Sequence, residues 1–349
     1  MAACTLHGSE ELPPDVASST AQPSTLNEAG LAETSPPVSR TPLPAPTLVL
    51  SPAERAFFHI LPIRTKAIPV LLFHAICPAA CGPADTYGVT QQEFTRILLA
   101  AESAGYRTIS IANYVKAMQG DWGTLPPRPL LVTFDDGRLD GYRGADDVLR
   151  MLGERAVMYV ITASADANSA FAMRWSEILS AQSSSRWDMQ LHAHAGHTRV
   201  SVQEPADGGL PDAAVVGPFY AWRRWQPGTP VQSAHAESFA EWKVRAESDI
   251  TTGSERLVAE LGPSPERSLS FAVPFGDYGQ VHSNDVGIAP SLRSFLDAHF
   301  PVWFTQPHAD PDFTTTLSAS HEAFRYTIVR STTAETVYSW LARHAAPNK

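Results

Sequence analysis

The chain has 349 residues, 44% of them hydrophobic, which is enough for one large folded domain with a sizeable core. Its formal net charge is −10 at pH 7 and it has no basic run, so nucleic acid and anionic membranes are poor candidates for partners. We see no apolar stretch long enough to span a bilayer.

Residues 1–47 are rich in Pro, Ser, Thr and Ala, with few aromatic or periodic apolar positions. Such a segment buries too little apolar surface to offset its ordering entropy, so we predict a disordered tail. It lacks the basic start and apolar centre of a secretory signal. We therefore expect a cytoplasmic protein by default, or an extracytoplasmic one if the start is misassigned. The sequence gives no indication of an oligomeric state.

Three cysteines make no disulfide framework. We expect Cys77 and Cys81 to be free thiols, although the two could close a small loop.

Strand and helix patterns alternate about seven times from residue 48 to the end, in one domain. The expected strands are 68–74, 108–111, 130–134, 156–161, 188–192, 268–273, 302–305 and 326–329. The expected helices are 91–104, 114–118, 142–152, 175–181, 237–261, 292–300 and one that begins after Thr332. This alternation predicts parallel βα units, in a barrel or in a doubly wound sheet.

Two adjacent carboxylates, Asp135 and Asp136, end the apolar strand pattern 130–134 and are followed by Gly137. Neighbouring residues on a strand point to opposite faces, but at a strand end where glycine lets the chain turn both can reach one cavity. Buried carboxylates need a compensating cation or proton. The pair is therefore a candidate for metal binding.

A histidine cluster, His192, His194 and His197, follows the strand pattern 188–192. One carboxylate and two imidazoles form a three-ligand set with an open position, which suits catalytic zinc and also non-haem Fe(II). A second carboxylate favours hydrolysis, because a hydrolase needs a base beside the metal-bound water. An alternative pair of ligands, His194 and His197, is sterically possible.

Two further motifs lie at strand ends. Pro274-Phe275-Gly276 would fix the backbone after the strand 268–273, so that free N–H groups there could face an oxyanion. His74 ends the first ordered strand, in the same layer as the acids, and is a candidate catalytic residue.

The segment Thr133-Phe134-Asp135-Asp136-Gly137 resembles the TFDDG motif of the polysaccharide deacetylases, the NodB-homology carbohydrate esterases. The spacing of His192 and His197, the Pro-Phe-Gly motif and the strand 70–74 resemble those of the poly-N-acetylglucosamine deacetylase branch. The resemblance implies a deformed (β/α)7 barrel that holds zinc or another divalent ion such as Co²⁺, Ni²⁺ or Fe²⁺.

The same resemblance implies roles for individual residues. Asp136, His192 and His197 would be the metal ligands, and Asp135 the general base. The backbone N–H of Phe275 would help to stabilise the oxyanion. The leaving amine must be protonated, and His74 is our candidate for that acid.

The sequence departs from the family pattern in three places. The arginine that often precedes the proline motif is absent, and so is a Leu-x-His motif near the C-terminus. The insertion at 198–232 is unusually long and carries Phe219, Tyr220, Trp222 and Trp225. Aromatic faces can stack on sugar rings or form an ordinary core. We predict that Tyr220 and Trp222, together with Pro274, contact substrate.

The sequence therefore predicts a metal-dependent hydrolase that removes acetyl groups from a carbohydrate, with N-acetylhexosamine units of a polysaccharide or glycan precursor as the expected substrate. Two alternatives remain open. A carbohydrate-binding pseudoenzyme would bind glycan without releasing acetate. A non-haem iron oxygenase would use the same ligands but gives Asp135 no evident role.

Overall fold

The computed structural model describes Pro46 and residues 48–62, 67–82, 85–123, 125–202, 216–226, 233–306 and 320–345. The predicted disordered tail, 1–47, lies outside the described residues apart from Pro46. The middle of the aromatic insertion, residues 203–215 and 227–232, also lies outside them.

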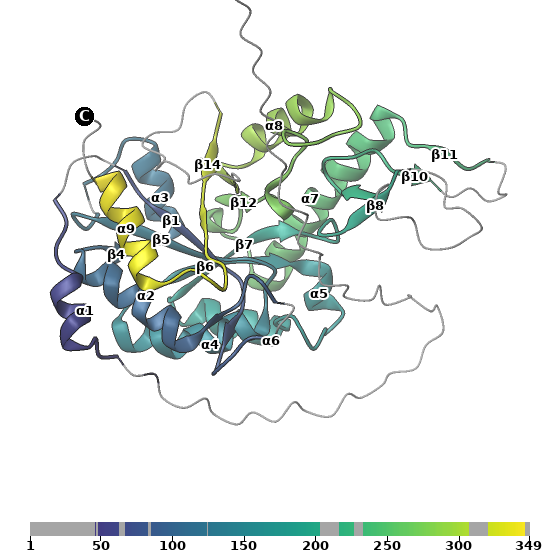
Figure 1. Cartoon of the computed structure of the whole chain (residues 1–349). Helices are drawn as coiled ribbons and strands as arrows, with labels where there is room; N and C mark the ends of the chain where they lie inside the picture. The colour runs from purple at the N-terminus through teal and green to yellow at the C-terminus, as the bar shows by residue number, and fades with distance from the viewer. Residues whose placement is uncertain are drawn as a thin grey trace, which may run out of the picture.

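One parallel sheet of nine strands forms the centre of the molecule (Figure 1). Its strands are β1 (Val70–Phe73), β4 (Arg107–Thr108), β5 (Pro129–Phe134), β6 (Ala156–Ile161), β7 (Trp187–Ala193), β12 (Ser270–Ala272), β13 (Val302–Thr305), β14 (Glu322–Phe324) and β15 (Tyr326–Thr327). The order is β14-β13-β12-β7-β6-β5-β1-β15, with β4 paired to β5 off this path.

The two ends of this path are joined by a single residue. Arg325 alone separates β14 from β15, yet β14 pairs with β13 at one end and β15 pairs with β1 at the other. This segment therefore brings the two sheet edges together and nearly closes a barrel. The deformed (β/α)7 barrel that the sequence predicts is confirmed.

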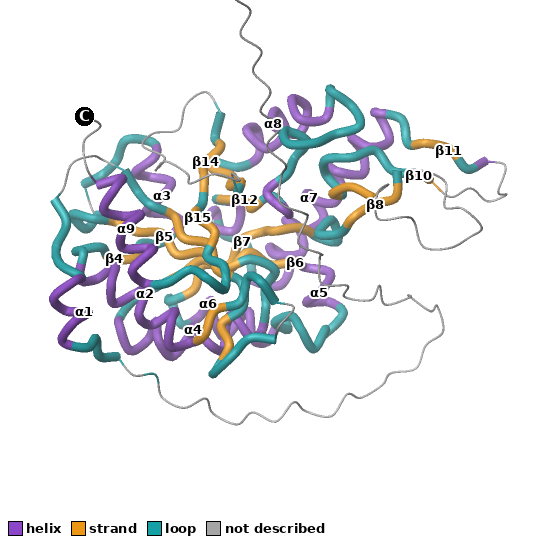
Figure 2. The backbone as a smooth tube through the Cα atoms, viewed as in Figure 1, coloured by secondary structure: helices purple, strands orange, loops and turns teal. Residues whose placement is uncertain are grey.

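Helices surround the strands, and three short two-stranded ribbons lie outside the main sheet (Figure 2). The helices are α1 (Pro52–Phe57), α2 (Gln91–Ser103), α3 (Ile111–Met118), α4 (Leu139–Leu152), α5 (Thr162–Asp166), α6 (Trp175–Ser183), α7 (Phe239–Leu261), α8 (Ile288–His299), α9 (Ala334–Ala345) and the 3₁₀ turns η4 (Pro265–Ser268) and η5 (Pro274–Gly276). The ribbons pair β2 (Ile76–Cys77) with β3 (Val89–Thr90), β8 (Arg199–Ser201) with β9 (Val216–Pro218) and β10 (Trp225–Gln226) with β11 (His235–Ala236). No helix in the described ranges is both long and apolar enough to cross a membrane.

Alternate residues of each strand face two different cores. Leu130, Val132 and Phe134 of β5 pack in the large cluster beneath the helices, whereas Leu131 belongs to a second cluster, inside the barrel. A strand that is buried on both faces has this near-continuous apolar sequence. Because side chains alternate along a strand, the parity of each position decides which residues can meet inside the barrel.

Cys77 and Cys81 are joined in a disulfide, so the expectation of free thiols is wrong. The turn after β2 places the two Cα atoms 5.3 Å apart, within bridging range.

Candidate metal centre and active site

Strand parity brings the predicted polar residues to one end of the barrel interior. Leu131 faces inward on β5, so Asp135 continues the inward series four residues later. Val70 faces inward on β1, which gives His74 the same direction. Leu191 faces outward on β7, so its neighbour His192 faces inward. All three lie at or just beyond the carboxyl ends of parallel strands, where barrel enzymes place their chemistry.

The turn after β5 lets Asp136 join this group. Asp136 has φ of +69° and Gly137 has φ of +60°, so two successive residues adopt the left-handed conformation. Aspartate tolerates this conformation better than most residues, and glycine adopts it without strain. The reversal directs the Asp136 carboxylate back into the cavity instead of outward, as strand alternation would otherwise require.

Asp136, His192 and His197 form the one cluster of three possible metal ligands found among the described residues. The Oδ1 atom of Asp136 lies 3.4 Å from Nε2 of His192 and 3.3 Å from Nε2 of His197. Tetrahedral bonds of about 2.0–2.1 Å to zinc would separate ligand atoms by roughly 3.3–3.4 Å. That Oδ1 atom is also buried without a hydrogen-bond partner. The three residues thus fit a tetrahedral cation.

Hydrogen bonds orient the imidazoles of His192, at the end of β7, and of His194, just after it. His192 donates from Nδ1 to the carbonyl of Ala272, over 2.8 Å, which leaves Nε2 free to bind a metal. His194 instead places Nδ1 2.9 Å from the hydroxyl of Thr162 and is not in the cluster. The geometry therefore favours His192 with His197 over the alternative pair.

Asp135 is fully buried and is held by Arg325. The guanidinium donates from its two terminal nitrogens to the two carboxylate oxygens, over 2.7 and 2.8 Å. Burial alone would raise the pKa of Asp135, but the Arg325 charge, the nearby imidazoles of His192 and His74 and the hydrogen bonds from Arg325 together outweigh it and hold the pKa below the usual range. Gln306 adds a weaker contact, 3.4 Å from Oδ2. Asp135 therefore stays ionised and fixed in direction.

His74 is half-buried and interacts with the carboxylates of Asp136 and Asp135. Burial lowers the pKa of its imidazole, against the opposing effect of the Asp136 and Asp135 carboxylates. Its Nδ1 atom is buried without a hydrogen-bond partner. Tyr87, 46% exposed, tilts against the ring at 4.9 Å between centroids. The catalytic role of His74 stays a prediction.

Phe275 packs directly on a candidate ligand. Its ring stacks on that of His197 at 4.5 Å, and the Arg199 guanidinium lies 5.4 Å from the Phe275 ring centroid. Phe275 has φ of +59°, an uncommon conformation for a bulky residue, and it lies between Pro274 and Gly276 in η5. Pro274 is buried, so its contribution in the structure is to shape this backbone. The oxyanion role of the Phe275 amide stays a prediction.

Tyr220 and Trp222, which we predicted to contact the sugar, are both at least partly buried. Tyr220 is 1% exposed, so its ring is covered and offers no stacking face. Trp222 is partly buried, and its Nε1 donates to the carbonyl of His282. Both side chains are covered because α7 packs against the turn 219–222 that carries them.

Sequence reasoning missed two residues beside the site, Arg325 and Asp249. Arg325 is an arginine within the apolar pattern 323–329, and Asp249 is an acid on the buried face of α7, beside Ile250. A charged residue at an apolar position is the signal that could have identified both, because such residues are rarely buried without a partner.

No protein-family model and no curated protein matches the sequence. Solved structures do match the fold. A de-N-acetylase from Aggregatibacter actinomycetemcomitans is 18% identical with a TM-score of 0.61, over 78% of this chain and 99% of that chain. The BpsB deacetylase domain from Bordetella bronchiseptica is 20% identical with a TM-score of 0.56, over 76% and 96%. A polysaccharide deacetylase from Bacillus cereus is 18% identical with a TM-score of 0.52, over 79% and 69%. In its fold, this chain resembles the polysaccharide deacetylases.

Proposed function

We propose that this protein is a metal-dependent carbohydrate deacetylase that hydrolyses the amide of N-acetylhexosamine units. The single observation that carries the proposal is the pairing of a three-residue candidate cation site with a second, buried carboxylate that Arg325 holds by two hydrogen bonds. Asp136, His192 and His197 fit the cation, and Asp135 lies next to them with its Oδ2 atom 3.9 Å from Nε2 of His192. The likeness of fold to a de-N-acetylase agrees with this assignment.

A divalent ion held by the three ligands would lower the pKa of a water molecule and polarise the acetyl carbonyl. Asp135 removes a proton from the attacking water, and its lowered pKa keeps the carboxylate deprotonated near neutral pH before that step. Arg325 directs the carboxylate and offsets its charge while it is buried. Arg325 thereby supplies what the missing arginine before Pro274 would supply.

The remaining steps require a hydrogen-bond donor and an acid. The amide N–H of Phe275 donates to the carbonyl oxygen as negative charge develops there. His74 delivers a proton to the leaving nitrogen, which requires the imidazole to be protonated in the substrate complex although burial lowers its pKa in the free protein, and acetate and a free amine are the products. The water O–H bond and the amide C–N bond break, a C–O bond and an N–H bond form, and no oxidant is consumed.

Two exposed aromatic rings at the rim are the natural sugar-stacking surfaces in place of Tyr220. Tyr87 contacts His74, and Phe171, 50% exposed, carries the Arg138 guanidinium 4.6 Å from its ring centroid. Arg138 also binds Asp85, whose carboxylate accepts the amide of Tyr87. The two rings are thus linked through Arg138, two residues after Asp136.

Acetate release from a panel of N-acetylated and O-acetylated sugars tests this function, with zinc-loaded wild type compared with Asp135→Asn. We expect release from an N-acetylhexosamine oligomer, and a loss of about 10²–10⁴-fold in the variant. Release from O-acetyl esters alone would correct the bond that is cleaved. Glycan binding without any release would replace the enzyme with a binding protein.

A further inference from the structure

A carboxylate outside the cation site holds the loop between its two histidines. Asp249 of α7 is 9% exposed. Its Oδ2 atom accepts the amide of His194 over 3.0 Å, and its Oδ1 atom accepts the amide of Ala195 over 2.8 Å. These amides lie between His192 and His197, so one side chain fixes the backbone that sets the separation of the two imidazoles.

The hydroxyl of Tyr220 donates to the same carboxylate, at Oδ2. Burial raises the pKa of Tyr220 well above its usual value and the Asp249 charge raises it further, so the phenol stays a donor. The loop is packed directly on this pair. A Cβ atom at Gly196 would lie 2.5 Å from the Tyr220 hydroxyl and 2.9 Å from Oδ2 of Asp249, so a side chain there would displace them.

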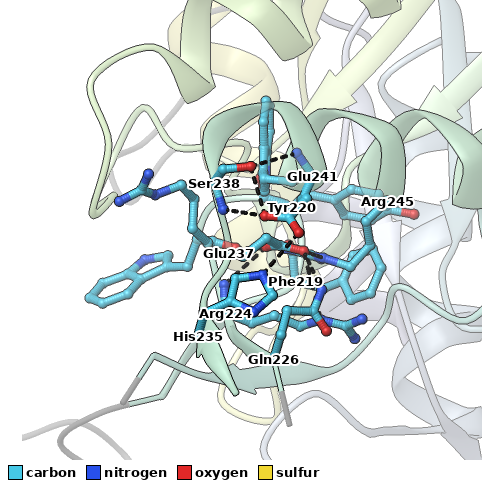
Figure 3. Close-up of polar contacts among 12 residues, drawn as sticks. Phe219, Tyr220, Arg224, Gln226, His235, Glu237, Ser238, Glu241 and Arg245 are labelled. Atoms are coloured by element: carbon cyan, nitrogen blue, oxygen red, sulfur yellow. Dashed lines mark hydrogen bonds and ion pairs between the residues drawn. The ribbon is translucent and has the colours of Figure 1, made fainter. Parts of the chain in front are cut away.

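The turn that carries Tyr220 is tied to α7 through its carbonyl groups (Figure 3). Arg245 donates to the carbonyls of Phe219 and Trp222, over 2.8 and 2.9 Å, and Trp242 donates from Nε1 to that of Tyr220, over 3.0 Å. On a helix, positions 242, 245 and 249 share one face. The same face of α7 therefore holds the insertion turn and, one turn further along, the histidine loop.

Glu237 completes this attachment and explains why Arg245 has one orientation. Glu237 is fully buried and accepts from Nε and the terminal NH2 group of Arg245, both over 2.8 Å. It also accepts the backbone amide of Arg224 over 3.0 Å (Figure 3). A buried carboxylate with this many donors is well satisfied, so the geometry is rigid.

We propose that Asp249 and Tyr220 are positioning residues for the cation site, and that the ordered turn of the insertion, residues 219–222, sets the affinity of that site for metal. The inference rests on the proposed function only in requiring that Asp136, His192 and His197 bind a divalent ion. It assigns the turn a role in metal affinity, rather than in contact with sugar.

Zinc affinity of the full chain, measured by competition with a chromophoric chelator, tests the inference directly. Asp249→Asn keeps the size of the side chain but leaves only one acceptor oxygen for three donors, so we expect zinc binding to weaken about 10–100-fold. Tyr220→Phe removes only the hydroxyl and should weaken it by a smaller factor. Hydrogen exchange of the peptide 192–198 in the zinc-free protein should accelerate in both variants.

Tyr338→Phe is the matched control, because Tyr338 of α9 is 5% exposed and its hydroxyl donates to the carbonyl of His59, which follows α1. It should lower the melting temperature without changing zinc affinity or exchange at 192–198. Unchanged zinc affinity in both Asp249→Asn and Tyr220→Phe would overturn the inference and leave the proposed deacetylase intact. Weakened affinity in these variants, together with a wild-type protein that binds zinc but releases no acetate, would support the inference and refute the deacetylase. A wild type that binds no divalent ion would overturn both.

Discussion

Replacing Arg325 with methionine removes the partner of a fully buried carboxylate. Asp135 and Arg325 are both 0% exposed and share two hydrogen bonds. Removing one member of such a pair leaves the other charge uncompensated, which costs about 3–5 kcal/mol of unfolding free energy. Asp135→Asn should cost a similar amount, because it leaves the Arg325 charge unpaired among Tyr159 and Phe304.

The double variant, Arg325→Met with Asp135→Asn, separates charge pairing from simple packing. It buries no charge at these two positions, so we expect its loss of stability to be smaller than the sum of the two single losses, with a coupling energy of about 3 kcal/mol. Urea unfolding of the four proteins at pH 7 gives the cycle. The pKa of Asp135 is lowered by Arg325, so the pair stabilises above the carboxyl's unfolded pKa and the cost of Arg325→Met should shrink as pH falls. Additive losses in the double variant would refute this reasoning.

Three further outcomes follow from other contacts. Zinc at 100 times its dissociation constant should raise the unfolding free energy of the wild type by about 2.7 kcal/mol, and should leave Asp136→Ala unchanged in a thermal shift assay. Tyr87→Ala and Phe171→Ala should raise KM for a sugar oligomer with little change in kcat, and a fall in kcat alone would exclude them as stacking surfaces. Hydrogen bonds from Ser51 lower the pKa of Glu54 to about 2, below its ordinary 4.5, so this carboxylate stabilises the fold above pH 4.5 and less as pH falls toward 2. Glu54→Gln should therefore lower the melting temperature at pH 7 and have a diminishing effect in acid.

The strand-end residues could be predicted from sequence because their positions depend on local periodicity. The apolar run before Asp135 defines β5, and its parity alone directs Asp135 inward. His192 follows from the same rule on β7. A short-range pattern was sufficient for these residues, and it led to the right fold.

Arg325 could not be assigned a partner in the same way. It is separated from Asp135 by 190 residues, and it reaches Asp135 only because β14 and β15 join the two edges of the sheet. The family pattern would place an arginine just before Pro274, but Ala272 and Val273 occupy those positions. Closure of the barrel is a tertiary event that no local pattern encodes.

The burial of Tyr220 also depends on tertiary packing. An aromatic residue in a long insertion can serve as a sugar platform or as core, and composition does not distinguish these. Contacts from Trp242 and Asp249 on α7 decide the matter by burying both the backbone and the hydroxyl of the turn. Likewise, a sequence separation of four residues does not decide whether Cys77 and Cys81 bond, whereas the distance of 5.3 Å between their Cα atoms in the fold permits it.

The central claim is that the cation site and Asp135 act together on an acetylated sugar. Acetate release from an N-acetylglucosamine oligomer by metal-free protein, before and after one equivalent of zinc is added back, tests it most directly. We expect no release before addition and full activity afterwards, with release about 10²–10⁴-fold slower from Asp135→Asn carrying the same zinc. Equal release without metal, or none from a wild type that has bound zinc, would contradict the account.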